Sequence, residues 1–358
     1  MASWAEFPDG VSMSEGSFRT LARFSPDGSL DVFASDQHGS YKKLCGSFFK
    51  HVGIKREAND DDVTEVCRRF ACALGGSATA ALFNSLAFLS NGFRALLGEK
   101  VMLIGRLEDT EAQAIDGGRG QLAKLYTQPE EVADRVDAFK TLVKLDPDHD
   151  ASWKRNQEWL ARVYERCRKL EKPLFNETLI FQRPGESKAQ MARRLPDAVV
   201  RMAEDFSPYG DFYKTQVPLL WTEDGGKIER VSSPQAVRDA MLEMDKVCHR
   251  PILLLSAAVD FEQYAAQYGI VSDIVAGPMC GRAYFKEAFT AATTRDWDTL
   301  EAAFRAIALP RVEQIRSICR VMSRPWWCKF KTMAPEAKAA IQVEAKPRAP
   351  RADADGGY

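Results

Sequence analysis

The sequence has 358 residues, of which 45% are hydrophobic and 28% are charged, and its formal net charge is −1. These values are typical of a globular protein with a sizeable core. The length fits two domains or one α/β barrel, since such barrels have roughly 250 residues plus insertions. The nearly neutral balance gives no electrostatic reason to expect nucleic acid or an anionic membrane as a partner.

Cysteine and histidine usage predicts neither a disulfide framework nor a zinc site. The eight cysteines include no Cys-x-x-Cys pair, and the four histidines show no zinc-ligand spacing. The first residues lack the basic-then-apolar order of a signal peptide, and no run approaches the roughly 18 apolar residues of a membrane-spanning helix. We therefore expect a soluble protein of the reducing cytoplasm, with no metal or other cofactor.

Short apolar runs alternate with longer amphipathic stretches, a pattern typical of repeated βα units. The runs are 30–35, 78–82, 101–105, 139–145, 174–181, 212–219, 252–256 and 274–280. The helical patterns are 61–74, 128–135, 151–170, 188–205, 234–247 and 261–268, with helix starts expected at Asp61, at Ser232-Ser233 and at Asp260. Eight strands with alternating helices predict a (β/α)8 TIM barrel. An open doubly wound sheet is disfavoured, because no Gly-x-Gly-x-x-Gly follows a strand.

Composition divides the chain into three parts. We expect residues 1–20 to be an N-terminal extension and residues 21–330 to form the single barrel domain. Residues 331–358 are rich in Ala, Pro, Lys, Arg and Asp. Such a segment cannot bury a core, so we expect it to be a disordered tail.

One lysine, Lys214, lies in the middle of the strand-like stretch 212–220. A buried central strand normally excludes lysine, because moving an ammonium out of water costs several kcal/mol or forces the group to lose its proton. A lysine held there with a depressed pKa is a free amine, which can form a Schiff base with a ketone. The alternative is an edge strand on which Lys214 points into solvent.

Three charged residues lie on consecutive predicted strands, namely Lys140, Glu177 and Lys214. In a barrel of this kind, chemistry takes place at the carboxyl ends of the strands, where inward-pointing side chains converge. We expect Lys140 and burial to lower the pKa of Lys214, and Glu177 to carry protons. Taken singly, each residue also fits a surface position or a structural salt bridge.

The last two predicted strands end in residues suited to an anion. Ser256-Ala257 follows the seventh strand and Gly281-Arg282 follows the eighth, where TIM barrels commonly bind phosphate. We expect a phosphate site here, while a tight turn with an exposed arginine is the alternative. The first strand ends in Asp36-Gln37, which adds two further polar side chains at the same end of the barrel.

Together these segments resemble the class I tagatose-bisphosphate aldolase family, which includes the sulfofructosephosphate aldolases. The resemblance extends from about Leu21 to about Trp327 and leaves out the tail. The segments that carry it are Asp36-Gln37-His38-Gly39, Phe139-Lys140, Asn176-Glu177, Tyr213-Lys214-Thr215-Gln216-Val217-Pro218, Leu255-Ser256-Ala257 and Cys280-Gly281-Arg282-Ala283.

The resemblance implies a TIM barrel that cleaves a phosphorylated ketose, without metal, to dihydroxyacetone phosphate and an aldehyde, in carbohydrate metabolism. It implies Lys214 as the Schiff-base lysine, with Lys140 beside it, and Glu177 as the acid/base group. It places Asp36 and Gln37 on substrate hydroxyls or the imine region. It assigns the phosphate to Ser256, Ala257, Gly281 and Arg282. The family is often oligomeric, which makes a homo-oligomer a further expectation.

The chain departs from the family pattern at several positions. His38 replaces an arginine, Gln216 replaces a glutamate, Ala258 replaces a glycine, and Asn84 lies near a typical aspartate. The run 101–111 also lacks the family's Tyr-Glu-Lys-Thr-Gly-Tyr motif. Two alternatives therefore stay open: a metal-dependent barrel lyase or isomerase with Asp36 and Glu177 as ligands, and a barrel that binds sugar phosphate without turnover.

Overall fold

The computed structural model describes residues 13–109, 111–224, 227–257 and 259–329. Eight parallel strands form a closed barrel in the order β1-β2-β3-β6-β7-β8-β11-β12, and β12 pairs with β1. The strands are β1 (Val32–Ser35), β2 (Ala80–Phe83), β3 (Met102–Arg106), β6 (Ala138–Leu145), β7 (Leu174–Ile180), β8 (Phe212–Gln216), β11 (Ile252–Leu255) and β12 (Gly277–Cys280). Each overlaps one of the eight predicted runs. The predicted TIM barrel is thus confirmed.

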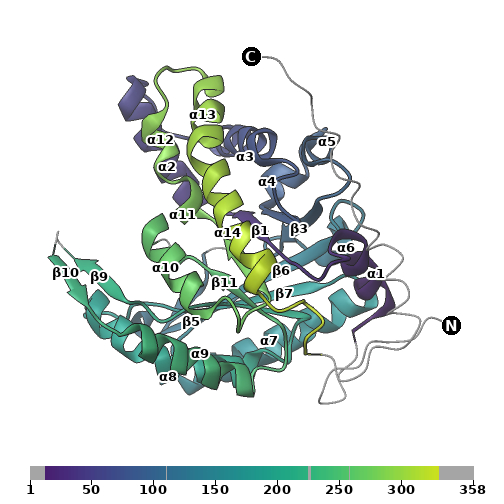
Figure 1. The fold of residues 1–358 in the computed structure, drawn as a ribbon, viewed down its shortest axis with the longest axis vertical. Coiled ribbons are helices and arrows are strands. Elements are labelled where there is room, and N and C mark those ends of the chain that lie inside the picture. The colour runs from purple at the N-terminus through teal and green to yellow at the C-terminus, as the bar shows by residue number, and fades with distance from the viewer. Residues whose placement is uncertain (1–12, 110, 225–226, 258, 330–358) are drawn as a thin grey trace.

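Helices surround the strands (Figure 1). They are α1 (Glu15–Phe24), α2 (Gly39–Val52), α3 (Asp60–Leu74), α4 (Ser85–Phe88), α5 (Phe93–Leu97), α6 (Pro129–Val132), α7 (Asp150–Lys169), α8 (Lys188–Phe206), α9 (Pro234–Val247), α10 (Phe261–Val271), α11 (Arg282–Phe285), α12 (Ala288–Ala291), α13 (Trp297–Ala303) and α14 (Leu309–Met322). All six predicted helical patterns are helical, although α6 is shorter than expected.

The helix starts follow from side-chain capping. Ser233 caps α9, ahead of Pro234 at the first helical position, and Asp260 caps α10, both as predicted. The expected start at Asp61 is one residue late, because Asn59 and Asp62 form a reciprocal capping box around the first turn of α3.

Two antiparallel hairpins were not predicted. One joins β4 (Gln113–Ile115) to β5 (Gly120–Leu122), and the other joins β9 (Trp221–Asp224) to β10 (Lys227–Arg230), which extends away from the barrel in Figure 1. Both follow barrel strands, β3 and β8 respectively. They therefore belong to the loops at the carboxyl end.

Helix α1 lies across the boundary that we set at residue 20, and it packs on the amino-terminal end of the barrel. Phe18 and Leu21 of α1 join one apolar cluster with Phe175, Phe212 and the fully buried Trp326. The Trp326 ring meets Phe18 edge-on at 5.8 Å, and its indole N–H donates to the Ser25 carbonyl at 2.9 Å. The predicted tail lies outside the described residues.

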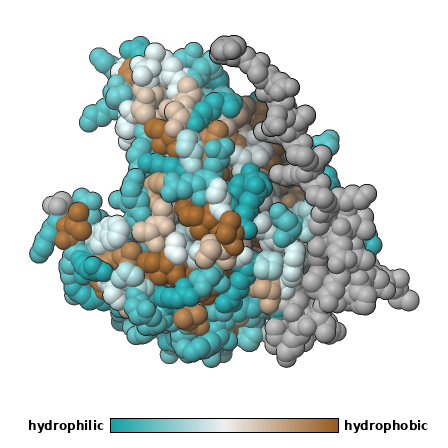
Figure 2. All heavy atoms as spheres, viewed as in Figure 1, coloured by the Kyte–Doolittle hydropathy of each residue, from teal (hydrophilic) through white to brown (hydrophobic). Residues whose placement is uncertain are grey.

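Within the part of the chain that the structure describes, no helix is both long and apolar enough to span a bilayer. Figure 2 shows a mainly hydrophilic face with some apolar side chains near α10 and α14, and Val321 and Met322 at the end of α14 are 82% and 50% exposed. Scattered exposure of this kind is common in globular proteins.

Candidate active site

A cavity of about 540 Å³ opens at the carboxyl end of the barrel strands. The nine predicted site residues all line it: Asp36, Gln37, Lys140, Glu177, Lys214, Ser256, Ala257, Gly281 and Arg282. They come from β1, β6, β7, β8, β11 and β12, or from the residues directly after these strands. The structure therefore brings the nine residues to one place, while the roles that we assigned to them remain predictions.

Lys214 points into this cavity and is only 3% exposed, so the edge-strand alternative is wrong. Its Nζ lies 2.8 Å from Glu177 Oε2, and Lys140 Nζ lies 2.8 Å from the same oxygen. The contact follows from the strand register, which pairs Glu177 with Lys214 across β7 and β8. The three residues on consecutive strands thus converge as predicted, and one oxygen of Glu177 lies between the two lysine nitrogens.

Lys140 is the centre of a larger ionic cluster. Its Nζ contacts Asp36 Oδ2 at 3.0 Å and Glu108 Oε1 at 2.7 Å, in addition to Glu177. Arg106 donates to the backbone carbonyl of Asp36. All five residues are at most 6% exposed, so the contacts lie in a site of low dielectric.

Arg106 and Glu108 were missed by the sequence analysis. The third run was ended at residue 105, yet inward-facing positions on a strand repeat every second residue. Met102 and Ile104 are both in the apolar interior of the barrel, and the same parity leads to Arg106 and then to Glu108. Extending that alternation past the end of the run would have found both.

Neighbouring charges set the protonation states of the groups in this cluster. Burial opposes ionisation, but Lys140, Lys214 and Arg106 outweigh it at Asp36 and hold its pKa below the usual range. Lys140 and Lys214 likewise lower the pKa of Glu177 against the effect of burial. At Lys140, burial is outweighed by Asp36, Glu108 and Glu177, which raise its pKa. Lys140 is thus an ammonium and Asp36 and Glu177 are carboxylates.

The opposite side of the cavity carries fewer charges. Ser256 follows β11, Gly281 follows β12, and Arg282 is the half-buried first residue of α11. A Cβ at residue 281 would lie 2.5 Å from the carbonyl oxygen of Ala34, so glycine is required for this close approach. Ala257 has a φ of 47°, an uncommon conformation for a residue other than glycine and one often associated with functional sites.

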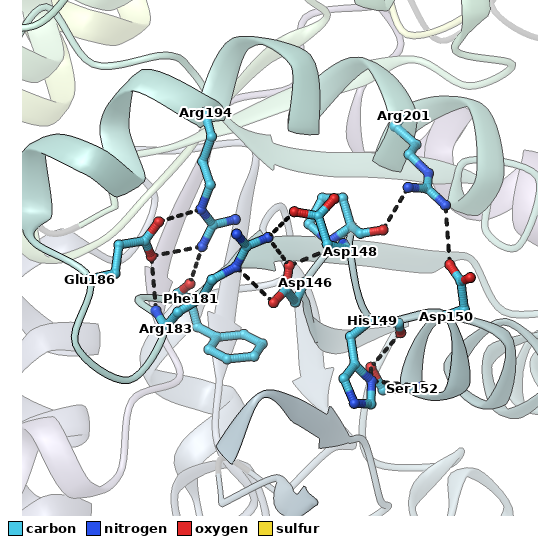
Figure 3. A network of polar contacts seen from close by, with 11 residues as sticks. Asp146, Asp148, His149, Asp150, Ser152, Phe181, Arg183, Glu186, Arg194 and Arg201 are labelled. Atoms are coloured by element: carbon cyan, nitrogen blue, oxygen red, sulfur yellow. Dashed lines mark hydrogen bonds and ion pairs between the residues drawn. The ribbon is translucent and has the colours of Figure 1, made fainter. Parts of the chain in front are cut away.

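The loops after β6 and β7 are joined by an ionic network, shown in Figure 3. Arg183 binds the fully buried carboxylate of Asp146 through two nitrogens, one of them at 2.8 Å, and it also contacts Asp148. Arg194 of α8 binds Glu186 at 2.6 Å. These contacts fix the loops directly beyond the cavity wall formed by Leu142, Lys144 and Leu179.

The departures from the family pattern fall in different places. His38 lines the cavity and contacts Asp60 at 2.8 Å. Asn84 is fully buried behind the site and donates to the Gln37 carbonyl at 3.1 Å. Gln216 is buried but is not among the residues of the cavity wall, and Ala258 lies outside the described residues.

Three carboxylates point toward one position, and Lys140 Nζ occupies it. Across the residues that the structure describes, no group of three or more His, Cys, Asp and Glu side chains is arranged to hold a metal ion. The acidic side chains thus neutralise a lysine of the chain itself.

Comparison with known proteins finds likeness in structure and none in sequence. No family model and no curated protein match the chain. A solved structure of fructose-bisphosphate aldolase from Plasmodium falciparum, in complex with TRAP and a small-molecule inhibitor, covers 87% of this chain and 97% of its own at a TM-score of 0.65 and 13% identity. The structure of Cgl0159 from Corynebacterium glutamicum covers 83% of this chain and 92% of its own, with a TM-score of 0.49 and 16% sequence identity. The first likeness establishes the shared fold.

Proposed function

We propose that this protein is a metal-independent class I aldolase that cleaves a phosphorylated ketose to dihydroxyacetone phosphate and an aldehyde through a Schiff base on Lys214. The observation that carries the proposal is a buried lysine on a barrel strand, directed into the cavity, with a carboxylate 2.8 Å from its Nζ. A nucleophilic amine beside a proton-carrying group is the arrangement that Schiff-base enzymes use. A solved structure that shares the fold is a fructose-bisphosphate aldolase, which agrees with the proposal.

Glu177 is placed to handle the protons of imine formation. The Lys214 ammonium passes a proton to Glu177, and the freed amine attacks the C2 ketone of the open-chain sugar. Glu177 then returns that proton to the C2 oxygen and relays a second proton to it from the attacking nitrogen, so that the oxygen leaves as water. The resulting iminium draws electrons from the C3–C4 bond, and cleavage gives an aldehyde and an enamine. Protonation and hydrolysis of the enamine release dihydroxyacetone phosphate and restore Lys214.

In this proposal, Lys140 positions the carboxyl groups of the site. As an ammonium bound to Asp36, Glu108 and Glu177, it fixes three carboxyl groups around the reacting carbons. In this role Asp36 and Gln37 bind substrate hydroxyls near the imine. Gln37 Nε2 already contacts Asp36 Oδ1 at 3.1 Å, which orients both side chains toward the cavity.

The phosphate of the dihydroxyacetone half fits the opposite side of the cavity. Arg282 supplies a guanidinium, Ser256 a hydroxyl, and Ala257 and Gly281 supply backbone at close range. The other end of the sugar would extend along the wall of Leu142 and Leu179 toward Lys144. Tagatose 1,6-bisphosphate and related ketose phosphates are therefore the first substrates to examine.

A panel of ketose phosphates, coupled to the detection of dihydroxyacetone phosphate, tests the proposal. We expect cleavage of at least one member, and we expect activity to survive EDTA. Activity that EDTA abolishes and a divalent cation restores would favour the metal-dependent lyase instead. Binding of sugar phosphates in calorimetry without cleavage would favour the non-catalytic barrel.

A further inference from the structure

Glu108 differs from the other two carboxyl groups of the ionic cluster in its hydrogen bonding. Its Oε1 is bound to Lys140 at 2.7 Å, whereas its Oε2 has no hydrogen-bond partner among the described residues. The residue is fully buried and lies on the cavity wall. A buried carboxyl oxygen without a partner costs stability, and such atoms are expected where a ligand completes the bonding.

We propose that Glu108 is a catalytic residue of the aldolase reaction, one that takes the proton from the C4 hydroxyl as the C3–C4 bond breaks. The proton passes to Oε2, and the O–H electrons form the aldehyde carbonyl. The electrons of the C3–C4 bond form the enamine and neutralise the iminium nitrogen. In the direction of synthesis, Glu108 donates this proton to the aldehyde oxygen. The inference rests on the proposed Schiff-base function and assigns to Glu108 the proton transfer of cleavage, for which the sequence analysis offered only Glu177 as a general proton carrier.

The surroundings of the three carboxyl groups support the assignment of this proton transfer to Glu108. Against the effect of burial, the neighbouring cations lower the pKa values of Asp36 and Glu177, and Glu177 already carries the protons of imine formation in the proposed function. Burial raises the pKa of Glu108, although Lys140 and Arg106 oppose the change and Asp36 adds to it. Carboxyl groups with pKa values pushed apart in one site serve as ionised ligand and as proton carrier respectively. Glu108 is thus the best proton acceptor of the three.

A chain of hydrogen bonds links Lys214 to Glu108. Around the arc of β8, β7, β6 and the segment after β3, the charged residues alternate in sign as Lys214, Glu177, Lys140 and Glu108. Each is one hydrogen bond from the next, so Lys214 Nζ and Glu108 Oε1 are separated by at most three hydrogen-bond lengths. The C4 oxygen of a bound ketose lies four bonds from the imine nitrogen, so in this proposal it lies between that nitrogen and Glu108.

The substitution Glu108→Gln tests the proposal, because glutamine keeps the shape of the side chain but cannot accept the proton. Three readouts separate the steps: borohydride trapping with dihydroxyacetone phosphate, exchange of its C3 hydrogen with solvent, and cleavage of a ketose bisphosphate. We expect trapping and exchange to stay within threefold of the unsubstituted protein. We expect cleavage to fall at least 100-fold, and the acid limb of its kcat/KM pH profile to disappear. Glu108→Asp should restore part of the cleavage.

Two results would overturn the assignment. Cleavage by the Gln variant within threefold of the unsubstituted protein would show that another group takes the proton. A parallel fall in trapping, exchange and cleavage would show that Glu108 only positions Lys140. Failure of the Schiff-base function itself is distinguishable, since the unsubstituted protein would then give no trapped adduct on Lys214.

Discussion

The two ends of the barrel use the same strands for opposite purposes. At the amino-terminal end, the inward residues Ala138, Phe175 and Phe212 on β6, β7 and β8 pack with Trp326 in an apolar cluster. Two residues further along each strand, about 7 Å away, the inward residues are Lys140, Glu177 and Lys214. A shift of two residues along each strand thus leads from a packed apolar core to a buried ionic site. Under the proposed function, the first layer serves mainly stability and the second serves chemistry.

The largest effect is expected from Lys214→Arg in the charged layer. Arginine keeps the positive charge next to Glu177 but cannot form an imine, so cleavage should fall by more than about 10⁴-fold. Steady-state kinetics on the best substrate of the panel would measure it, and the thermal midpoint should show that the barrel remains folded.

Lys172→Arg is the matched control. This half-buried lysine, two residues before β7, binds the Val136 carbonyl at 2.7 Å and, through burial, has a lowered pKa, yet it lies outside the cavity. We expect unchanged cleavage. Equal losses in the two variants would mean that Lys214 acts only as a buried cation.

The apolar layer is tested by Trp326→Ala. Removal of a fully buried indole that also donates a hydrogen bond to Ser25 should lower the free energy of unfolding by about 3–5 kcal/mol. Chemical denaturation would measure the loss. The kcat per folded molecule should stay within about twofold, and a large fall in kcat with unchanged stability would contradict the separation of the two layers.

A smaller effect is expected at the phosphate side. Arg282→Ala should raise KM for a ketose phosphate by roughly 10- to 100-fold, because one charged hydrogen bond to phosphate contributes about 1.5–3 kcal/mol. The KM for dephosphorylated ketose should change little. Equal effects on both sugars would show that Arg282 does not contact the phosphate.

The pH dependence of stability gives the smallest effect. Asp36 and Glu177 have folded-state pKa values below their ordinary values of 3.8 and 4.5, so the unfolded chain binds protons first as the pH falls. Their contribution to stability is present above those ordinary values and is lost as the pH falls through the lowered ones. Urea unfolding between about pH 5 and pH 2 should show this loss. In the double variant Asp36→Asn, Glu177→Gln, the free energy of unfolding should change less with pH over this range. An unchanged slope would contradict the assignment of the loss to these two carboxylates.

The sequence predicts the barrel well because its signal is local. Alternating strand and helix patterns follow from periodicity, and helix starts such as Ser233 and Asp260 follow from capping chemistry within one turn. The hairpin 113–122 was missed although Asp116-Gly117-Gly118 is a strong turn signal, and Gly117 does adopt a φ of 65°. A search limited to βα alternation passes over such insertions.

The site could be predicted only in part, because its contacts join strands far apart in the chain. Strand order and parity are enough to bring Lys140, Glu177 and Lys214 to one end of the barrel. One oxygen of Glu177 lies between the two lysines, and this position depends on the register of three strands. Glu108 contacts Lys140 as well, and this contact depends on where β3 ends. Neither fact has a local sequence signal.

The central claim is that Lys214 forms the Schiff base, and covalent trapping tests it most directly. The protein would be incubated with dihydroxyacetone phosphate and borohydride, digested, and mapped by mass spectrometry. We predict a single reduced adduct on Lys214, with none on Lys140 or Lys172 and none at all in Lys214→Arg. Turnover of a ketose phosphate with Lys214 left unmodified would contradict the account.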